Sequence, residues 1–299
     1  MAETRYFLGI DGGGTGCRAR LTDRSGRILG EGSAGPANLA LGIDVAVAST
    51  MSATRQALAT AGLADEDLAL TDVGLGMAAA NVPRHKEALE KVALPFRSFV
   101  VLSDAETACL GAHAGADGGL LILGTGSQGV ICRNGVFTTV GGWGFAISDS
   151  GSGAILGRAA VRRAFLAHEG VEPPSALTEE IMKRFDANPS AMLEWAESAK
   201  PRDWGEFARI VFRHVEAGDP VSLELVRDNA SAVERMLDRM VALGAGRVAL
   251  MGGLAKPTRP YLSSRFDAVI VEAQGDALDG ALLLARRHAA KEENDATPT

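Results

Sequence analysis

Apolar and polar positions near the start of the chain fall into short runs separated by turns, which predicts strands. The run at about 5–11 is largely apolar, and Cys17–Leu21 alternates residue by residue. A third run at about 27–33 follows the polar turn Asp23–Gly26. Runs of this length, bounded by glycine, aspartate and serine, are typical of strands joined by tight turns. We therefore expect three consecutive antiparallel strands.

Helical and strand signals alternate after these three runs. Small residues predict a helix from about Ile43 to Ala61, and Val73–Met77 reads as a strand. Pro83 suits the first turn of a further helix, because a proline there gives up no helical hydrogen bond. The apolar run Phe99–Leu102 predicts a strand that leads to Asp104. The order of elements favours an α/β fold.

A second set of strands follows the glycine-rich junction Gly111–Gly119, at about 119–124, 128–132 and 135–140. From Gly151 to about Gly244 the pattern is that of long helices. We place a domain boundary in the junction, which predicts a first domain over 1–114. The second domain then spans 115–276 and carries a helical insertion.

The first predicted turn, between the first two strands, is unusually rich in glycine. It reads Asp11-Gly12-Gly13-Gly14-Thr15. Glycines let a backbone approach a ligand closely, and their N–H groups can converge on a phosphate. An aspartate beside them can hold a hydrated Mg²⁺. The same residues also form ordinary hairpin turns, and the turn matches neither the Walker loop nor the dinucleotide fingerprint.

Two later strand ends repeat the glycine pattern. Leu120–Leu123 leads into Gly124-Thr125-Gly126-Ser127, and a strand resumes afterwards. A third run, Val248–Met251, ends in Gly252-Gly253. Each turn alone has a structural explanation that is more common than ligand binding. Together, the first two look like the halves of a duplicated phosphate clamp.

Composition limits the classes of protein and partner. The net charge is −7, from 30 basic and 37 acidic residues, which disfavours a dedicated nucleic-acid binder. Three widely spaced cysteines without a pairing pattern suggest a reducing compartment. No run approaches the roughly 20 apolar residues that span a bilayer, and no leader pattern begins the chain. We therefore expect a cytoplasmic protein without membrane or nucleic-acid partners.

These motifs, in this order, resemble those of the ASKHA superfamily of sugar kinases, actin and heat-shock ATPases. The strand end Val100–Ala105 resembles the connecting element between its two phosphate loops. Asp104-Ala105 and the segment Gly141–Gly153 are similar to the BadF/BcrA-type branch, which holds N-acetylglucosamine kinase and bacterial glucosamine kinase. The resemblance implies a duplicated ribonuclease-H-like α/β fold, with two lobes, a central cleft and a last helix, about 277–290, that returns to the first lobe.

The resemblance also implies an ATP and Mg²⁺ site. Asp104 would be the general base that takes the proton of a sugar 6-hydroxyl, and Asp11 would hold Mg²⁺ through water. Helix capping for Asp104 and turn stabilisation for Asp11 remain open alternatives. The residues expected at the ATP phosphates and the adenosine are Gly12, Gly13, Gly14, Thr15, Gly124, Thr125, Gly126, Ser127, Gly252 and Gly253.

The expected sugar-binding residues are Asn38, Asp104, Gly142, Trp143 and Asp149. Carboxylates suit sugars because they accept hydrogen bonds from paired hydroxyls. Asp149 could equally cap a helix that begins near Ser152, and Asn38 could merely stabilise a turn. Trp143 either flanks the 2-substituent of the sugar or only packs.

The predicted function is an ATP-dependent amino-sugar kinase. Trp143 favours N-acetylglucosamine as the acceptor. The alternative is free glucosamine, because segments such as Ile147–Asp149 and Pro201–Asp203 resemble bacterial glucosamine kinase more closely. A second class in the family is the ATPase activator that holds an iron–sulfur cluster. Such a cluster needs thiolates close together, and the cysteines lie on separate predicted elements. A non-catalytic sugar sensor is a third class, and a homodimer is left open.

Overall fold

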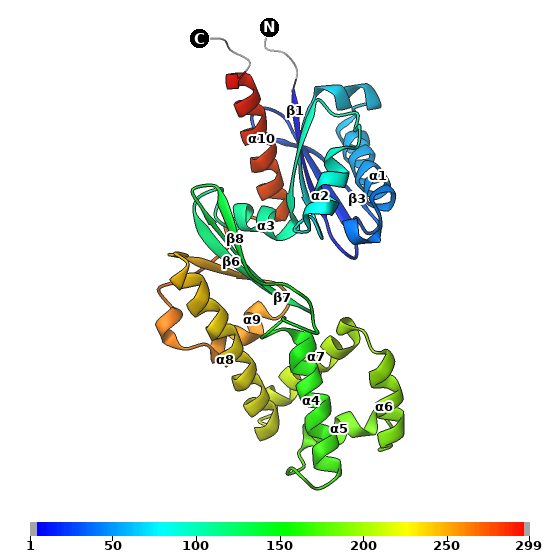
Figure 1. Ribbon diagram of the computed structural model, residues 1–299, viewed down its shortest axis with the longest axis vertical. Helices are drawn as coiled ribbons and strands as arrows, with labels where there is room; N and C mark the ends of the chain where they lie inside the picture. Colours follow the sequence, from blue (N-terminus) through cyan, green and yellow to red (C-terminus); the bar gives the residue numbers. More distant parts are fainter. Residues whose placement is uncertain (1–4, 296–299) are drawn as a thin grey trace. The chain divides into compact units, whose positions relative to one another are not determined.

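The computed structural model describes residues 5–295, and its contacts divide the chain into two compact units. Unit 1 holds the residues up to Gly118, a short stretch at 134–137 and the residues from Glu272 onward. Unit 2 holds Gly119–Arg133 and Thr138–Val271. Figure 1 follows the chain through both units.

Unit 1 is built on a five-stranded sheet of order β3-β2-β1-β4-β5. The first three strands are antiparallel, as the sequence predicts, and β4 and β5 run parallel to β1. The strands are β1 Tyr6–Gly12, β2 Cys17–Thr22, β3 Ile28–Ala34, β4 Thr71–Met77 and β5 Ser98–Ser103.

Helices cover both faces of this sheet (Figure 1). Helix α1 (Ile43–Ala61) packs on β2 and β3, while α3 (Asp104–Ala112) and α10 (Ala277–Asp295) pack together against β1 and β4. Glycines permit this close approach. A Cβ at Gly74 would collide with the backbone of α10, and one at Gly280 with the backbone of α3. The packing brings the N-termini of α3 and α10 to the end of β1.

Unit 2 repeats the sheet, in the order β10-β9-β6-β7-β8. β9 runs parallel to β6 and to β10, just as β4 does to β1 and β5. The two sheets therefore correspond strand for strand, and the predicted duplicated α/β fold is confirmed. The strands are β6 Gly118–Leu123, β7 Ser127–Arg133, β8 Val136–Gly141, β9 Val248–Met251 and β10 Ile270–Val271.

Helices make up the rest of unit 2. Residues of α8 and the sheet share one apolar core, and α4, α5 and α7 form a second core with the start of α8. The helices are α4 Gly153–His168, α5 Ala176–Lys183, α6 Pro189–Ser198, α7 Pro201–Glu216, α8 Pro220–Ala242 and α9 Ala255–Thr258. In unit 1, α2 spans Pro83–Glu90. Within residues 5–295, no helix has the length and apolar character needed to span a bilayer.

Candidate active site

The glycine turn after β1 is a tight hairpin connection. Gly13 donates its N–H to the carbonyl of Gly16 at 2.8 Å, and its own carbonyl accepts the N–H of Ala37 at 3.0 Å. Gly14 and Thr15 are exposed at the tip. The N–H of Gly13 is thus used within the turn, which leaves the tip as the part of the loop that a phosphate can approach.

The glycines of the three turns divide into two groups. At Gly12 and Gly126 a Cβ would lie 2.7 Å from Met77 Sδ and 2.9 Å from Asp149 Oδ2, so a larger residue would displace the end of a neighbouring side chain. Gly252 has a φ of +96°, and a Cβ there would collide with the backbone of Leu123.

The other glycines have open space beside them and do not have a positive φ. They are Gly13, Gly14, Gly124 and Gly253. A Cβ at any of these positions would lie no closer than 3.4 Å to another protein atom. The protein fold does not require glycine there. A ligand that approaches the backbone closely would explain these residues.

Asp104 opens α3 but does not cap it. The cap is Ser103, whose Oγ accepts the N–H of Glu106 at 3.2 Å, while the Glu106 carboxylate accepts the N–H of Ser103 at 2.8 Å. The capping alternative for Asp104 is therefore wrong. Its Oδ1 accepts the N–H of Ala105 at 2.9 Å.

The surroundings of Asp104 favour its neutral form. Burial raises the pKa of this carboxyl, the Ala105 N–H partly opposes the shift, and the negative charge of Asp11 raises the pKa further. A carboxylate whose pKa is raised toward neutrality is a better proton acceptor than an ordinary aspartate. The same interaction indicates that Asp11 and Asp104 lie close enough to repel each other.

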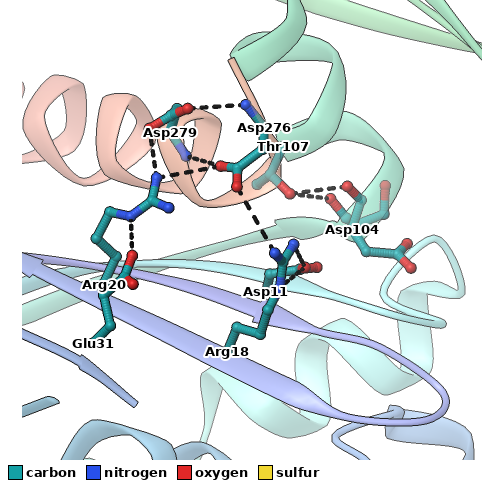
Figure 2. Close-up of polar contacts among 9 residues, drawn as sticks. Asp11, Arg18, Arg20, Glu31, Asp104, Thr107, Asp276 and Asp279 are labelled. Carbon is teal, nitrogen blue, oxygen red and sulfur yellow. Dashed lines mark hydrogen bonds and ion pairs between the residues drawn. The ribbon is translucent and has the colours of Figure 1, made fainter. Parts of the chain in front are cut away.

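Asp11, at the end of β1, forms an ion pair with Arg18 on β2 (Figure 2). The two residues are direct partners in the β1–β2 register, so their side chains share the sheet face that α10 covers. Arg20, two residues along, contacts Glu31, Asp276 and Asp279. Asp276 and Asp279 belong to the start of α10, so the close packing of that helix brings these charges together.

Asp11 suits a hydrated magnesium ion. Mg²⁺ in phosphoryl-transfer sites commonly keeps several waters and uses one or two carboxylates together with substrate phosphates. The Asp11 side chain is 20% exposed and stands next to the open glycine turn. Asp11 would hold the ion through water, where the ion would supply positive charge to the phosphates.

The turn after β6 rests on the first residues of α4. The Gly124 carbonyl accepts the N–H of Gly153 at 2.8 Å, and the Thr125 carbonyl accepts that of Ala154 at 3.1 Å. The Thr125 side chain is exposed, whereas Ser127 is buried and donates its hydroxyl to the Ser150 carbonyl at 2.8 Å. The Thr125 hydroxyl is therefore available to a phosphate, while the proton of Ser127 is already used inside the protein.

Asp149 is held in a strained backbone conformation beside this turn. Its φ is +59°, which non-glycine residues rarely adopt and which occurs often at functional sites. The cap of α4 is Ser152, whose Oγ accepts the Ile155 N–H at 3.3 Å, so the capping alternative for Asp149 is also wrong. Burial raises the pKa of Asp149, although the N–H groups of Ser127 and Gly144 donate to it and oppose the rise.

The loop before α4 carries the other expected sugar contacts of unit 2. Gly142 has a φ of +77°, and Trp143 is 66% exposed, with its backbone N–H donated to Ser148 Oγ at 3.2 Å. Ile147, in the same loop, is 86% exposed. Trp143 therefore does not merely pack within unit 2, and it offers an apolar surface to a ligand.

Asn38 lies beside the first glycine turn. Its Oδ1 accepts the N–H of Ala40 at 2.9 Å and so caps the short 3₁₀ turn Leu39–Leu41. Its Nδ2 lies 3.8 Å from where a Cβ of Gly14 would be. The turn role is therefore present, and the amide nitrogen still faces the predicted phosphate loop.

Two residues near the site, Arg18 and Gly205, are not among those that the sequence predicts. Arg18 could have been found from the strand pattern, since the residue that pairs with Asp11 across a short hairpin is predictable. Gly205, on α7, lies beside the Thr125 side chain, 3.8 Å from where its Cβ would be. No sequence signal connects α7 with that turn, because the contact depends on how α7 packs against α4.

The predicted site residues divide between the two units. Unit 1 holds Asp11, the first glycine turn, Asn38 and Asp104. Unit 2 holds the second glycine turn, Gly142, Trp143, Asp149 and the Gly252–Gly253 pair. Each unit thus carries a glycine turn and at least one partly or fully buried carboxylate.

Comparison with known proteins agrees with this architecture. The profile of the BadF/BadG/BcrA/BcrD ATPase family matches residues 8–285. The glucosamine kinase GspK of Vibrio cholerae is 39% identical over 280 residues, which cover 94% of this chain and 95% of that protein. An N-acetyl-D-glucosamine kinase of Dictyostelium discoideum is 26% identical over 79% of each chain.

A solved structure matches over nearly the whole length. It is that of a provisionally assigned N-acetylglucosamine kinase of Chromobacterium violaceum, with a TM-score of 0.85 and 32% identity. The match covers 94% of this chain and 99% of that one. The profile match spans both units and all three glycine turns, and this chain belongs to the BadF/BadG/BcrA/BcrD ATPase family.

Proposed function

We propose that this protein is an ATP-dependent kinase that phosphorylates the 6-hydroxyl of an amino sugar. The observation that carries the proposal is Asp104. It is a partly buried carboxylate with a raised pKa, and Ser103 rather than Asp104 caps α3. It also stands near Asp11 in a chain of this ATPase family. The 39% identity to a glucosamine kinase over nearly the whole length adds the substrate class.

The proposed chemistry follows from these groups. Asp104 takes the proton of the sugar hydroxyl as its oxygen attacks the terminal phosphorus of ATP, and ADP leaves with the bridging oxygen. Phosphoryl transfer depends mainly on positioning and on neutralising phosphate charge. The tips of the two glycine turns, with Thr15 and Thr125, would supply hydrogen-bond donors to the phosphates, and Asp11 would hold a hydrated Mg²⁺.

The two candidate sugars differ in the substituent at carbon 2, which is a free amine in glucosamine and an N-acetyl group in N-acetylglucosamine. Trp143 favours an N-acetyl group, because an exposed indole can cover a methyl group. The identity to a glucosamine kinase favours a free amine, and it draws on 94% of the chain rather than on one side chain. We therefore rank glucosamine first and N-acetylglucosamine second, the reverse of the order that Trp143 alone suggests.

The activator class of this family has less support here. An iron–sulfur cluster needs neighbouring thiolates. Cys17 and Cys109 are buried on β2 and α3 of unit 1, and Cys132 is buried on β7 of unit 2. Burial raises the pKa of Cys17 to about 11, which opposes ligation by its thiolate.

The test is a coupled assay of ADP release across glucosamine, N-acetylglucosamine, glucose and a no-sugar control. We expect sugar-dependent ADP release with an amino sugar, and Asp104→Asn should lower kcat roughly a hundred- to ten-thousand-fold. The variant should still bind ATP in calorimetry. Sugar-independent ATP hydrolysis, or full activity in the variant, would contradict the proposal.

A further inference from the structure

Arg18 contacts the carboxylate that is proposed to hold the metal. Its Nη2 and Nε lie 2.6 and 3.1 Å from the same atom, Asp11 Oδ2. The Arg18 side chain is 53% exposed and that of Asp11 is 20% exposed. Two donors on one oxygen leave little room for a water of a hydrated metal ion on that oxygen. A metal ion whose water uses this oxygen must therefore compete with Arg18 for it.

A second carboxylate stands within reach of Arg18. Arg18 Nη1 lies 3.8 Å from Oδ2 of Asp276, at the start of α10 (Figure 2). The other oxygen of Asp276 is engaged, because Oδ1 accepts the N–H of Asp279 at 3.0 Å and lies 3.4 Å from Arg20 Nη1. Asp276 is thus fixed in place with one oxygen directed at Arg18.

Arg20 differs from Arg18 in just this respect. Its side chain is only 17% exposed, and it lies 2.6 Å from Glu31 and 2.7 Å from Asp279. Arg20 is held by several carboxylates, whereas Arg18 has one close partner and one distant partner. Small rotations of the Arg18 side chain can transfer it from one to the other.

We propose that Arg18 is a positioning residue of the metal site, which neutralises Asp11 in the metal-free protein and moves to Asp276 when the metal ion arrives. The inference rests on the proposed function, because Asp11 is the metal-holding residue only in that reading. In the metal-free protein, the guanidinium of Arg18 offsets part of the negative charge of Asp11. It also makes the metal ion alone bind weakly, so that nucleotide phosphates are needed to complete the site.

The test measures binding of Mn²⁺ alone to the nucleotide-free protein by electron paramagnetic resonance. Arg18→Gln removes the competitor, so we expect Mn²⁺ to bind about threefold to tenfold more tightly than to the wild type. Asp276→Asn removes the second partner of Arg18 and should weaken binding severalfold. Asparagine caps helices as well as aspartate does, so α10 should stay intact.

The double variant Arg18→Gln/Asp276→Asn distinguishes a movement of Arg18 from an effect of the Asp276 charge alone. If Arg18 moves to Asp276, then Asp276→Asn should have almost no effect in the Arg18→Gln background. The same loss in both backgrounds would mean that Asp276 acts only by its charge, and the proposal would be overturned. Unchanged Mn²⁺ affinity in Arg18→Gln would overturn it as well.

Three further variants complete the design. Asp11→Asn should abolish the Mn²⁺ site, and retention of the site would place the ion elsewhere and overturn the proposal. Arg27→Gln removes an exposed arginine–aspartate pair of the same unit and should leave Mn²⁺ binding unchanged. If Arg18→Gln does not fold, Arg18→Lys takes its place, with a smaller gain in affinity expected. Failure of the proposed function would appear separately, as a wild type that phosphorylates no sugar.

Discussion

At the scale of single residues, two serines decide how two aspartates can act. Ser103 caps α3 and Ser152 caps α4, so neither Asp104 nor Asp149 is needed for a helix end. Asp149 is buried and Asp104 is partly buried, and desolvation raises the pKa of both carboxyls. A desolvated carboxyl that is not needed as a helix cap costs free energy of folding, which is typical of residues kept for chemistry.

Asp104→Asn should therefore stabilise the protein while it removes activity. The folded pKa of Asp104 lies above its unfolded value, so the wild type loses stability as pH rises between these two values. In the variant, the side chain at position 104 carries no charge at any pH. We expect its melting temperature to exceed that of the wild type at pH 7, and the difference to vanish in acid below about pH 4. Equal melting temperatures at pH 7 would contradict the burial argument.

Trp143 provides a test of the sugar's 2-substituent. If the indole packs on an acetyl methyl, Trp143→Ala should lower kcat/KM for N-acetylglucosamine severalfold more than for glucosamine. Burial of one methyl is worth about 1 kcal/mol, which sets that minimum. Equal losses with both sugars would make Trp143 only a wall of the site. Since Trp143 is 66% exposed, its replacement should leave the melting temperature unchanged.

At the scale of elements, the glycine turns separate packing from ligand approach. Gly252 is required by its φ of +96° and by the backbone of Leu123. Gly13 and Gly124 have ordinary space around them, and nothing in the described parts of the two units demands glycine there. The three strand ends look alike in sequence, yet their glycines serve different purposes.

Alanine substitutions at these turns should show the difference. Gly13→Ala and Gly124→Ala should fold with wild-type melting temperatures but bind ATP at least severalfold more weakly, because a methyl group would occupy the space of a phosphate. Gly252→Ala should lose about 1 kcal/mol or more of unfolding free energy. Calorimetric ATP titration and thermal melts provide the two readouts. Wild-type ATP affinity in both Gly13→Ala and Gly124→Ala would reduce these turns to plain hairpins.

At the scale of the whole molecule, the predicted site residues are divided between two units that each have their own core. A ligand that contacts both units must link their behaviour, because it binds the folded form of each. In the proposed function, residues of each unit would contact ligands, and kinases commonly close over their ligands to keep water from the phosphoryl group.

Binding of amino sugar together with a nonhydrolysable ATP analogue should therefore compact and stabilise the protein. We expect a smaller radius of gyration in X-ray scattering, and about 2.7 kcal/mol of added stability when the ligand is at a hundred times its Kd. Sorbitol, which is not an amino sugar, is the control. Identical scattering curves with and without saturating ligands would count against a site that both units share.

Local patterns in the sequence determined much of this protein. Alternation and glycine turns predict most strands of both sheets, although not β10 (Ile270–Val271). The reason is that the side chains of a strand alternate between its faces and that tight turns need special backbone geometry. The same turns, together with Asp104, carry the resemblance to the family that the profile match then confirms. The pairing of Arg18 with Asp11 could also have been predicted, because it follows from the register of the first hairpin.

Only the tertiary structure decided which of two local roles each residue takes. The sequence allowed Asp104 and Asp149 to be caps, and a single hydrogen bond to the neighbouring serine in each case rules this out. Several contacts also join residues that are far apart in the chain. They are the hydrogen bond from Ser127 to Ser150, the contact of Gly205 with Thr125 and the approach of Asp276 to Arg18. Such contacts depend on how helices pack on sheets, and packing is a property of the assembled units that no local pattern contains.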